Sequence, residues 1–277
     1  MINNIYKKYR FLIARRITQI SVMVLYVIAN VYGINFLTGN LSSSLLLNTV
    51  PLSDPYAVLQ MAVAGAIISV DILLGAFIIS IFYLIVGGRA FCSWVCPVNM
   101  ITDLANYLRR KFGFNQIQKK QPASRNIRYW VIAISLVISF FMGVAAFELV
   151  SPISMVHRGI IFGLGFGWAA MLVIFLFDLF VLKNGWCGHI CPLGGFYSLV
   201  GRFSLIRVHH NADNCTACMK CKEVCPENQV LHMVTKTSIP VLSGECTNCG
   251  RCVEVCDDDA LNFSIKNLKK ENKNEVR

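Results

Sequence analysis

The residues of this 277-residue chain most suited to chemistry are its twelve cysteines, which fall into four groups. Residues 215–226 read CTACMKCKEVCP and residues 246–256 read CTNCGRCVEVC, so both segments have the spacing C-x2-C-x2-C-x3-C. A [4Fe–4S] cluster needs four thiolates, and a tight loop of this kind supplies three of them. The repeated spacing therefore predicts two [4Fe–4S] clusters.

In two-cluster folds the last cysteine of each motif binds the cluster of the other motif. The expected ligands of one cluster are Cys215, Cys218, Cys221 and Cys256, and those of the other are Cys246, Cys249, Cys252 and Cys225. Zinc also accepts four thiolates, but two identical runs with Pro226 after the first favour iron–sulfur clusters. The tight spacing favours metal ligation over disulfides. Asp257 follows the second motif at a position where proline is common. It could belong to an anionic patch beside the cluster, or to a solvated turn.

The other four cysteines form two pairs with the spacing C-x3-C-P. They lie 95 residues apart in AFCSWVCPVNMITDL and GWCGHICPLGGFYSL, and are Cys92, Cys96, Cys187 and Cys191. Residues i and i+4 share one face of a helical turn, and a proline fits directly after such a turn. We expect the two pairs to converge on one redox or metal site, which could hold a further cluster or a single metal.

Two other interpretations of these pairs stay open. They could cycle as dithiols, because Arg89, Lys183 or His189 would lower the pKa of a neighbouring thiol. They could equally be inert cysteines packed in small-residue turns.

The composition indicates how these motifs are positioned. The chain is 55% hydrophobic and 15% charged, with a mean hydropathy of +0.56 that is too high for an ordinary soluble domain. Four apolar blocks are each long enough, at ~1.5 Å per residue, to cross a ~30 Å hydrocarbon core. They are Ile17–Leu37, Met61–Gly87, Tyr129–Leu149 and Ile161–Leu182.

We expect an α-helical membrane domain of four transmembrane helices over residues 1–200. A C-terminal α+β two-cluster, bacterial ferredoxin-like domain with a basic tail follows over residues 201–277.

The formal net charge of +11 comes from basic residues that flank the apolar blocks. They gather before the first block and between residues 88 and 128, whereas the 38–60 and 150–160 segments hold almost none. Basic flanks mark the cytoplasmic side, so this pattern fits membrane orientation better than nucleic-acid binding. No cleavable signal peptide is evident. We expect a multi-pass protein of the bacterial inner membrane with both termini and all cysteines on the cytoplasmic side.

Ionisable residues at membrane depth are candidates for accepting protons from a quinol. The four candidates are Asp71, Glu148, His157 and Asp178. Asp71 is expected deep in the second block, Asp178 near the cytoplasmic edge, and the other two at the far edge. Each could instead be a neutral group satisfied between helices. No histidine lies inside a block, which argues against a haem bound by two histidines within the bilayer.

The four apolar blocks, FCSWVCP and WCGHICPLG after the second and fourth, and the tandem cluster motif together resemble the NapH family. This family is the ferredoxin-type membrane component of the periplasmic nitrate reductase system, and the resemblance covers nearly the whole chain. It implies a quinol dehydrogenase that takes electrons from menaquinol or ubiquinol. It also implies partners, namely a periplasmic iron–sulfur subunit of the NapG type and a cytochrome c leading to nitrate reductase.

Related polyferredoxins share these motifs, so other function classes remain. The chain could be a redox or maturation factor for a respiratory metalloenzyme, in which the C-x3-C-P thiols reduce or metallate a client. It could also be a scaffold that docks a partner to the membrane. Reduction of the clusters by quinol would distinguish a quinol dehydrogenase from a maturation factor and from a scaffold.

Overall fold

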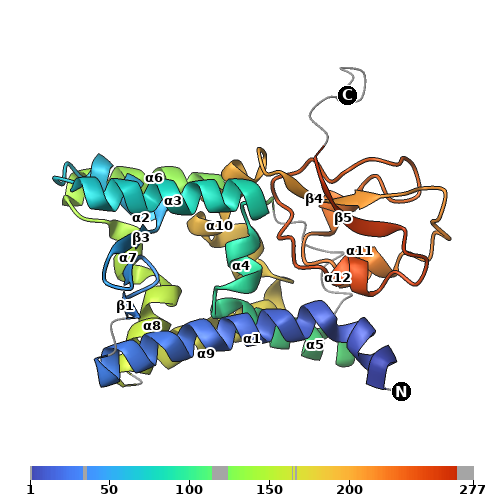
Figure 1. Ribbon diagram of the computed structural model, residues 1–277, viewed down its shortest axis with the longest axis horizontal. Coiled ribbons are helices and arrows are strands. Elements are labelled where there is room, and N and C mark those ends of the chain that lie inside the picture. The colour runs from blue at the N-terminus through green and yellow to red at the C-terminus, as the bar shows by residue number, and fades with distance from the viewer. Residues whose placement is uncertain (1, 34–35, 114–123, 164, 166, 267–277) are drawn as a thin grey trace.

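The computed structural model describes residues 2–33, 36–113, 124–163, 165 and 167–266. A larger helical part holds the apolar blocks, and a smaller α+β part near the C-terminus lies beside it along the long axis of the molecule (Figure 1). The expected basic tail, residues 267–277, lies outside the described residues.

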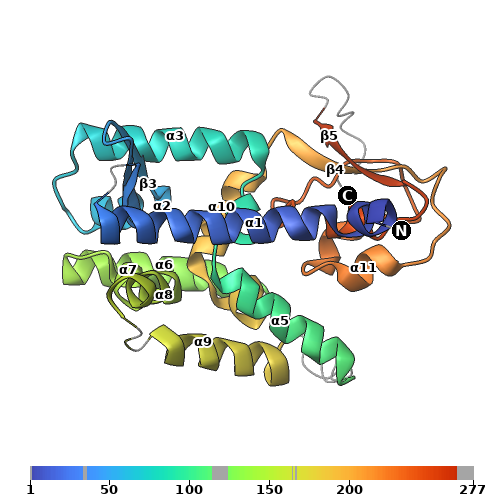
Figure 2. The same cartoon turned by 60° about the horizontal axis from the view of Figure 1, so that its bottom comes forward.

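The helical part is built on long apolar helices that run along the long axis (Figures 1 and 2). These are α1 (Ile2–Tyr32), α3 (Val70–Val86), α6 (Ile127–Met142) and α9 (Gly167–Leu176), which continues into the π-helix η2 (Phe177–Val181). Their outer surfaces carry large apolar side chains, since Phe77, Phe141 and Val173 are 64%, 80% and 65% exposed. Polar Gln19 and Ser139 are instead fully buried. An apolar exterior around polar interior groups is the reverse of a soluble core.

Of the helices described, α1 contains the one segment long and apolar enough to cross a membrane, Tyr9–Tyr32. The apolar helices Val70–Val86, Ile127–Met142 and Gly167–Val181 are shorter. The expected four transmembrane helices are therefore not confirmed by the helices described. The second, third and fourth blocks are each divided, and the helix of the first block ends at Tyr32 instead of Leu37.

Left-handed glycines and helix-starting residues cause these breaks. The second block is divided between α2 (Pro55–Val63) and α3, with Gly65 at φ +76° in the turn between them. The third block stops at Gly143, where φ is +68°, and α7 (Ala146–Val150) follows. Glycine reaches this backbone region without a Cβ penalty, so it commonly ends helices. The start of the fourth block belongs to α8 (Pro152–Phe162).

A small antiparallel sheet lies between α1 and α2, in the order β1-β2-β3, and the sequence analysis did not anticipate it. Its strands are β1 (Leu37–Gly39), β2 (Ser43–Leu46) and β3 (Val50–Ser53). It leads into α2, whose N-cap residue Asp54 accepts a hydrogen bond from the Ala57 N–H at 3.2 Å. Asp before Pro is a common way to start a helix.

The cysteine pairs lie on short helical turns at the end of the helical part that faces the α+β part. The first pair is on α4 (Ala90–Trp94) and the turn into α5 (Val98–Lys111). The second is on the π-helix η3 (Trp186–Ile190) and the turn into α10 (Pro192–Gly201). Gly88, just before α4, approaches the backbone of α10 so closely that a Cβ would overlap the Tyr197 carbonyl.

The C-terminal part is α+β, as expected. Strand β4 (Ile206–His210) pairs antiparallel with β5 (Leu261–Ile265), and three short helices lie in the chain between them. These are α11 (Lys220–Val224), the 3-10 helix η4 (Asn228–Leu231) and α12 (Arg251–Glu254). Val208, Met233 and Leu261, each at most 2% exposed, belong to its own hydrophobic core.

Candidate iron–sulfur centres

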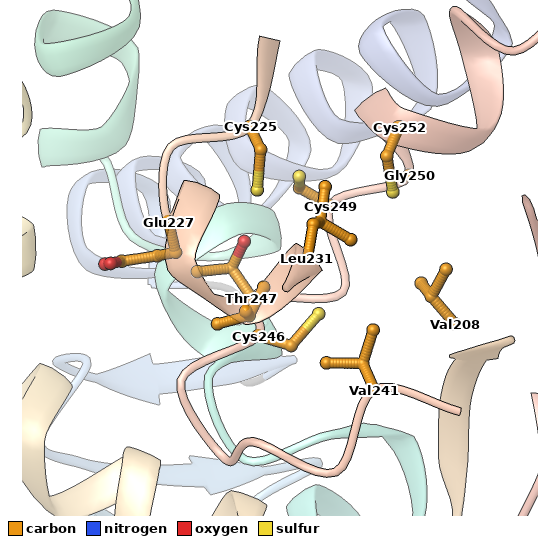
Figure 3. Close-up of a pocket in the computed structure, with 11 residues that line it drawn as sticks. Val208, Cys225, Glu227, Leu231, Val241, Cys246, Thr247, Cys249, Gly250 and Cys252 are labelled. Carbon is orange, nitrogen blue, oxygen red and sulfur yellow. The ribbon is translucent and has the colours of Figure 1, made fainter. Parts of the chain in front are cut away.

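The second cysteine motif and the last cysteine of the first motif surround one small cavity (Figure 3). Its walls carry Cys225, Cys246, Cys249 and Cys252 together with apolar side chains that include Val208, Leu231 and Val241. The structure thus brings together the cross-motif set expected from the sequence, in largely apolar surroundings.

The remaining cysteines of the tandem motif also form a group. Cys221 lies within electrostatic reach of Cys215, Cys218 and Cys256, which is the second expected set. Cys218 is exposed and Cys221 buried, so this group lies nearer the surface than the first.

Both loops share a backbone conformation suited to a cluster. Ala217 and Met219 flank Cys218 with φ of 58° and 59°, and Asn248 and Gly250 flank Cys249 with φ of 47° and 76°. Turns that include left-handed residues direct successive backbone N–H groups into a concavity, and such concavities bind anions, including the sulfides of iron–sulfur sites. The residues present therefore fit two clusters.

No three Cys, His, Asp or Glu side chains in the described parts of the chain are grouped closely enough to hold a single metal ion. The assignment of ligands therefore rests on how the thiols are grouped and on the loop conformation.

The C-x3-C-P cysteines converge in the core of the helical part. Cys96 and Cys191 are 5% and 7% exposed within this core, and Cys92 and Cys187 pack against it. Cys187 is within electrostatic reach of the other three. The expected meeting of the two pairs is thus present in the structure.

Each pair occupies one wide helical turn. The Cys96 N–H donates to the Phe91 carbonyl at 3.0 Å, and the Cys191 N–H donates to the Trp186 carbonyl at 2.9 Å. Both bonds reach back five residues, a wider turn than the α-helical one expected. Pro192 is the first residue of α10, where its missing N–H is not needed.

Burial raises the pKa of the Cys191 thiol to about 12, with Cys92 adding to the effect. The pKa values of the Cys96 and Cys187 thiols are also raised, mainly by burial. Burial thus disfavours the thiolate form of these three thiols in the absence of a metal. A coordinated metal would ionise its thiol ligands and offset this effect.

The first turn is hydrogen bonded to the second ferredoxin motif. The Ser93 hydroxyl donates to the Thr247 carbonyl at 2.7 Å, and the Trp94 indole Nε1 donates to the Asn248 carbonyl at 3.0 Å. Ser93 and Trp94 lie between Cys92 and Cys96, and Thr247 and Asn248 lie between Cys246 and Cys249. The two candidate centres are thus in direct structural contact.

A buried arginine joins the second turn to the same motif. Arg89, 1% exposed, donates to the Cys187 carbonyl at 2.9 Å, the Glu245 carbonyl at 3.0 Å and the Glu227 carboxylate at 2.7 Å. Glu227 is 2% exposed and also pairs with Arg125. These ion pairs fix the α+β part against the cysteine turns.

Helix α1 holds the α+β part from another side. Arg16 of α1 and Arg251 of α12 both bind the carboxylate of Asp103 on α5. The carboxylate of Glu254 accepts from the Leu12 N–H at 2.9 Å. Gly250 packs on the ring of Phe11 so closely that a Cβ there would overlap it.

Asp71 is not deep in a helix, which corrects the sequence expectation. The break after α2 makes Asp71 part of the first turn of α3, where it is exposed. A carboxylate is favoured there by the helix dipole.

The other three ionisable candidates each make a different set of contacts. Glu148 accepts from the Ser42 and Ser154 hydroxyls at 2.6 and 2.9 Å. His157, 3% exposed, packs edge-on against Tyr26. Fully buried Asp178 accepts from the Trp186 N–H at 3.1 Å, next to Cys187. Of the four candidates, Asp178 is thus the one that supports a cysteine turn.

A buried carboxyl that the sequence analysis missed is Asp54. It is 8% exposed, and it accepts a hydrogen bond from the Tyr197 hydroxyl on α10 at 2.8 Å. The Tyr197 ring stacks on Phe91, the residue before Cys92, with centroids 5.4 Å apart. The Asp-Pro helix start was visible in the sequence, but its contact with α10 was not.

Two protein families match this chain, one over the helical part and one over the ferredoxin part. A family described as a 4Fe-4S binding domain matches residues 68–115 and 164–209, which contain both C-x3-C-P pairs. A family described as a 4Fe-4S dicluster domain matches residues 207–257. No solved structure matches the chain.

Curated relatives match across most of the chain. The methylamine utilization ferredoxin-type protein MauN of Methylorubrum extorquens is 44% identical over 83% of this chain and 80% of the relative. The ferredoxin-type protein NapH of Escherichia coli is 43% identical over 82% of this chain and 78% of the relative. The chain therefore belongs to the family of ferredoxin-type iron–sulfur electron-transfer proteins that includes NapH and MauN.

Proposed function

We propose that the chain passes electrons from the quinol pool, as menaquinol or ubiquinol, through iron–sulfur clusters toward periplasmic nitrate reductase. One observation carries the proposal, namely the direct contact between the C-x3-C-P turns and the second ferredoxin motif. Ser93 and Trp94 hydrogen bond to the cluster loop, and Arg89 bonds to both the loop and the second turn. Redox centres on either side of this contact would be close neighbours in one electron path.

The ligands of these centres are part of the proposal. The tandem motif would hold two [4Fe–4S] clusters with the cross-motif sets described above. Cys92, Cys96, Cys187 and Cys191 would hold a further iron–sulfur cluster, because they converge in the core and because the 4Fe-4S binding domain match spans both pairs. A bound cluster supplies a one-electron carrier, and the protein buries it and fixes its neighbours.

We further propose that the helical part crosses the bacterial inner membrane several times, with both termini in the cytoplasm. Its exposed apolar surface supports this, since such large patches seldom face water. Basic flanks favour the cytoplasm for the cysteine turns. Reporter fusions after residues 45 and 155 should show a periplasmic location, and fusions after residue 115 and at the C-terminus a cytoplasmic one. A cytoplasmic signal at residue 45 would overturn this topology.

The partners would be a periplasmic iron–sulfur subunit of the NapG type and a cytochrome c. The similarity to the ferredoxin-type protein NapH supports a role in the Nap electron-transfer system. The MauN relatives are as similar, which favours a second candidate in which the same electron path serves methylamine utilization. In both cases the quinol-to-cluster step is the same, and the redox partner differs.

The decisive experiment uses full-length protein purified without oxygen and placed in lipid nanodiscs. A menaquinol or ubiquinol analogue is added, and cluster reduction is followed by EPR and visible absorbance. We expect quinol to reduce the clusters, and about eight or more irons per chain to be present. Clusters that dithionite reduces but neither quinol reduces would contradict the proposal and favour a maturation factor or a scaffold. Stoichiometric zinc with little iron would overturn the cofactor assignment.

A further inference from the structure

A large open groove is lined by residues of the N-terminal half of α1, of α5 and of α11 and α12 in the ferredoxin part. Figure 2 shows where these elements lie. Its volume is about 1170 Å³, which is ample for a small organic ligand. Ligand sites occur preferentially at domain interfaces of this kind. None of the four ionisable residues considered from the sequence is among the residues that line it.

The walls of the groove are amphipathic. Leu12, Met100, Leu104 and Val253 provide apolar surface, and Leu104 is 50% exposed. Arg10, Arg15, Arg16, Arg110, Lys220 and Arg251 are its six cations, and Asp103, Glu254, Asp257 and Asp259 are its four carboxylates. An apolar wall with a few polar groups is the usual environment of a ring with hydroxyl or carbonyl groups.

Cys256 lines the groove and belongs to the outer group of ferredoxin cysteines. A ligand in the groove would thus lie beside a proposed cluster ligand. The exposed apolar surface of α1 also begins at the groove, since Ile13 and Ile17 follow Leu12 and are 40% and 60% exposed. An isoprenoid tail could leave the groove along this surface.

We propose that this groove binds the head group of the quinol. The inference rests on the proposed quinol-dependent function for its choice of ligand. Oxidation of one quinol releases two electrons, which the iron–sulfur centres accept one at a time, and two protons, which pass to carboxylates and water. The excess of cations favours the anionic forms that a quinol adopts as it loses protons. Carboxylates of the groove can accept hydrogen bonds from quinol hydroxyls, which are donors that a phospholipid phosphodiester does not offer.

The test is photolabelling of the full-length protein, with its clusters, in nanodiscs of synthetic phosphatidylcholine. An azidoquinone is the probe, and labelled peptides are identified by mass spectrometry. We expect labelling within residues 98–111 and 251–256. Leu104→Trp should crowd the apolar wall of the groove and lower labelling about tenfold, while dithionite still reduces the clusters. Leu73→Trp, at a 51% exposed position on α3 that does not line the groove, is the matched control and should label as the unaltered protein does.

A second variant guards against misfolding of the first. Tyr107→Ala removes a side chain that is 56% exposed in the groove and should weaken labelling severalfold.

Labelling confined to α7 and α8, or unchanged in both variants, would overturn the proposal. Protection by phosphatidylglycerol but not by unlabelled quinone would assign the groove to an anionic lipid instead. If quinol reduces the clusters at the same rate in both variants, the proposed function is supported but quinol does not bind in the groove. If the probe labels the groove but quinol never reduces the clusters, quinol binding in the groove is supported and the proposed function is wrong.

Discussion

In the helical part, Cys96 and Cys191 end wide helical turns whose shape depends on the helices packed around them. In the ferredoxin part, Cys218 and Cys249 each lie between two residues with left-handed φ, in loops whose shape is largely local. The two kinds of site therefore depend on different forces. The cysteine turns depend mainly on tertiary packing. The loops depend more on local backbone conformation, although the second loop is also hydrogen bonded to Ser93 and Trp94. Damage to one kind of site should leave the other largely intact.

Removing ligands from the cysteine turns gives the largest expected effect. Changing Cys92 and Cys187 together to Ala should remove about four irons per chain and abolish reduction by quinol. Dithionite should still reduce the two ferredoxin clusters. Iron analysis and EPR measure both results.

Cys249→Ala is the matched control in the ferredoxin part. It should remove one ferredoxin cluster and leave the iron of the cysteine turns in place. Full quinol-driven activity of the Cys92/Cys187 variant would show that the turns are not a redox site.

Breaking the buried ion pairs between the two parts should have the next largest effect. Arg89→Met leaves Glu227 without one of its two cations in a buried site, so we expect a loss of about 3–5 kcal/mol in the free energy of unfolding. Denaturation of the purified protein, followed by cluster absorbance, measures this loss.

Lys220→Met is the control for the ion pairs, because Lys220 and Asp257 have side chains that are 53% and 79% exposed. We expect almost no change in the free energy of unfolding there, because solvent screens an exposed ion pair. Equal losses in the two variants would mean that the buried ion pairs do not hold the parts together.

A substitution in the second loop tests whether its conformation is local. Gly250→Ala places a Cβ at φ +76° and against Phe11, so we expect a loss of at least about 1–2 kcal/mol. Phe11→Ala removes the overlap, so the further loss that Gly250→Ala causes in a Phe11→Ala background is the backbone cost. If Gly250→Ala causes no further loss in that background, the loop conformation itself contributes little. Unfolding and EPR line shape are the measurements.

The smallest expected effect concerns one hydrogen bond between the two sites. Trp94→Phe removes the bond to the Asn248 carbonyl and should cost about 0.5–1.5 kcal/mol. Iron content should not change. A loss of iron from the ferredoxin motif would show that the turns determine the loop conformation, contrary to the comparison above.

The sequence alone determined the cysteine chemistry, the α+β ferredoxin part and the apolar character of the rest. These features are encoded by residue type and short-range spacing, as in the tandem C-x2-C-x2-C-x3-C runs. The cross-motif grouping of Cys225 with the second motif was also expected from the spacing.

Only the tertiary structure decided how the apolar blocks break and what they position. Hydropathy reports average burial over a window, so it did not register the turn at Gly65 that places Asp71 at an exposed helix start. The contact of Asp54 with Tyr197 joins residues 143 positions apart, and the pairing of Arg89 with Glu227 joins residues 138 apart. No local pattern encodes such contacts, because they form only when helices from distant parts of the chain pack together.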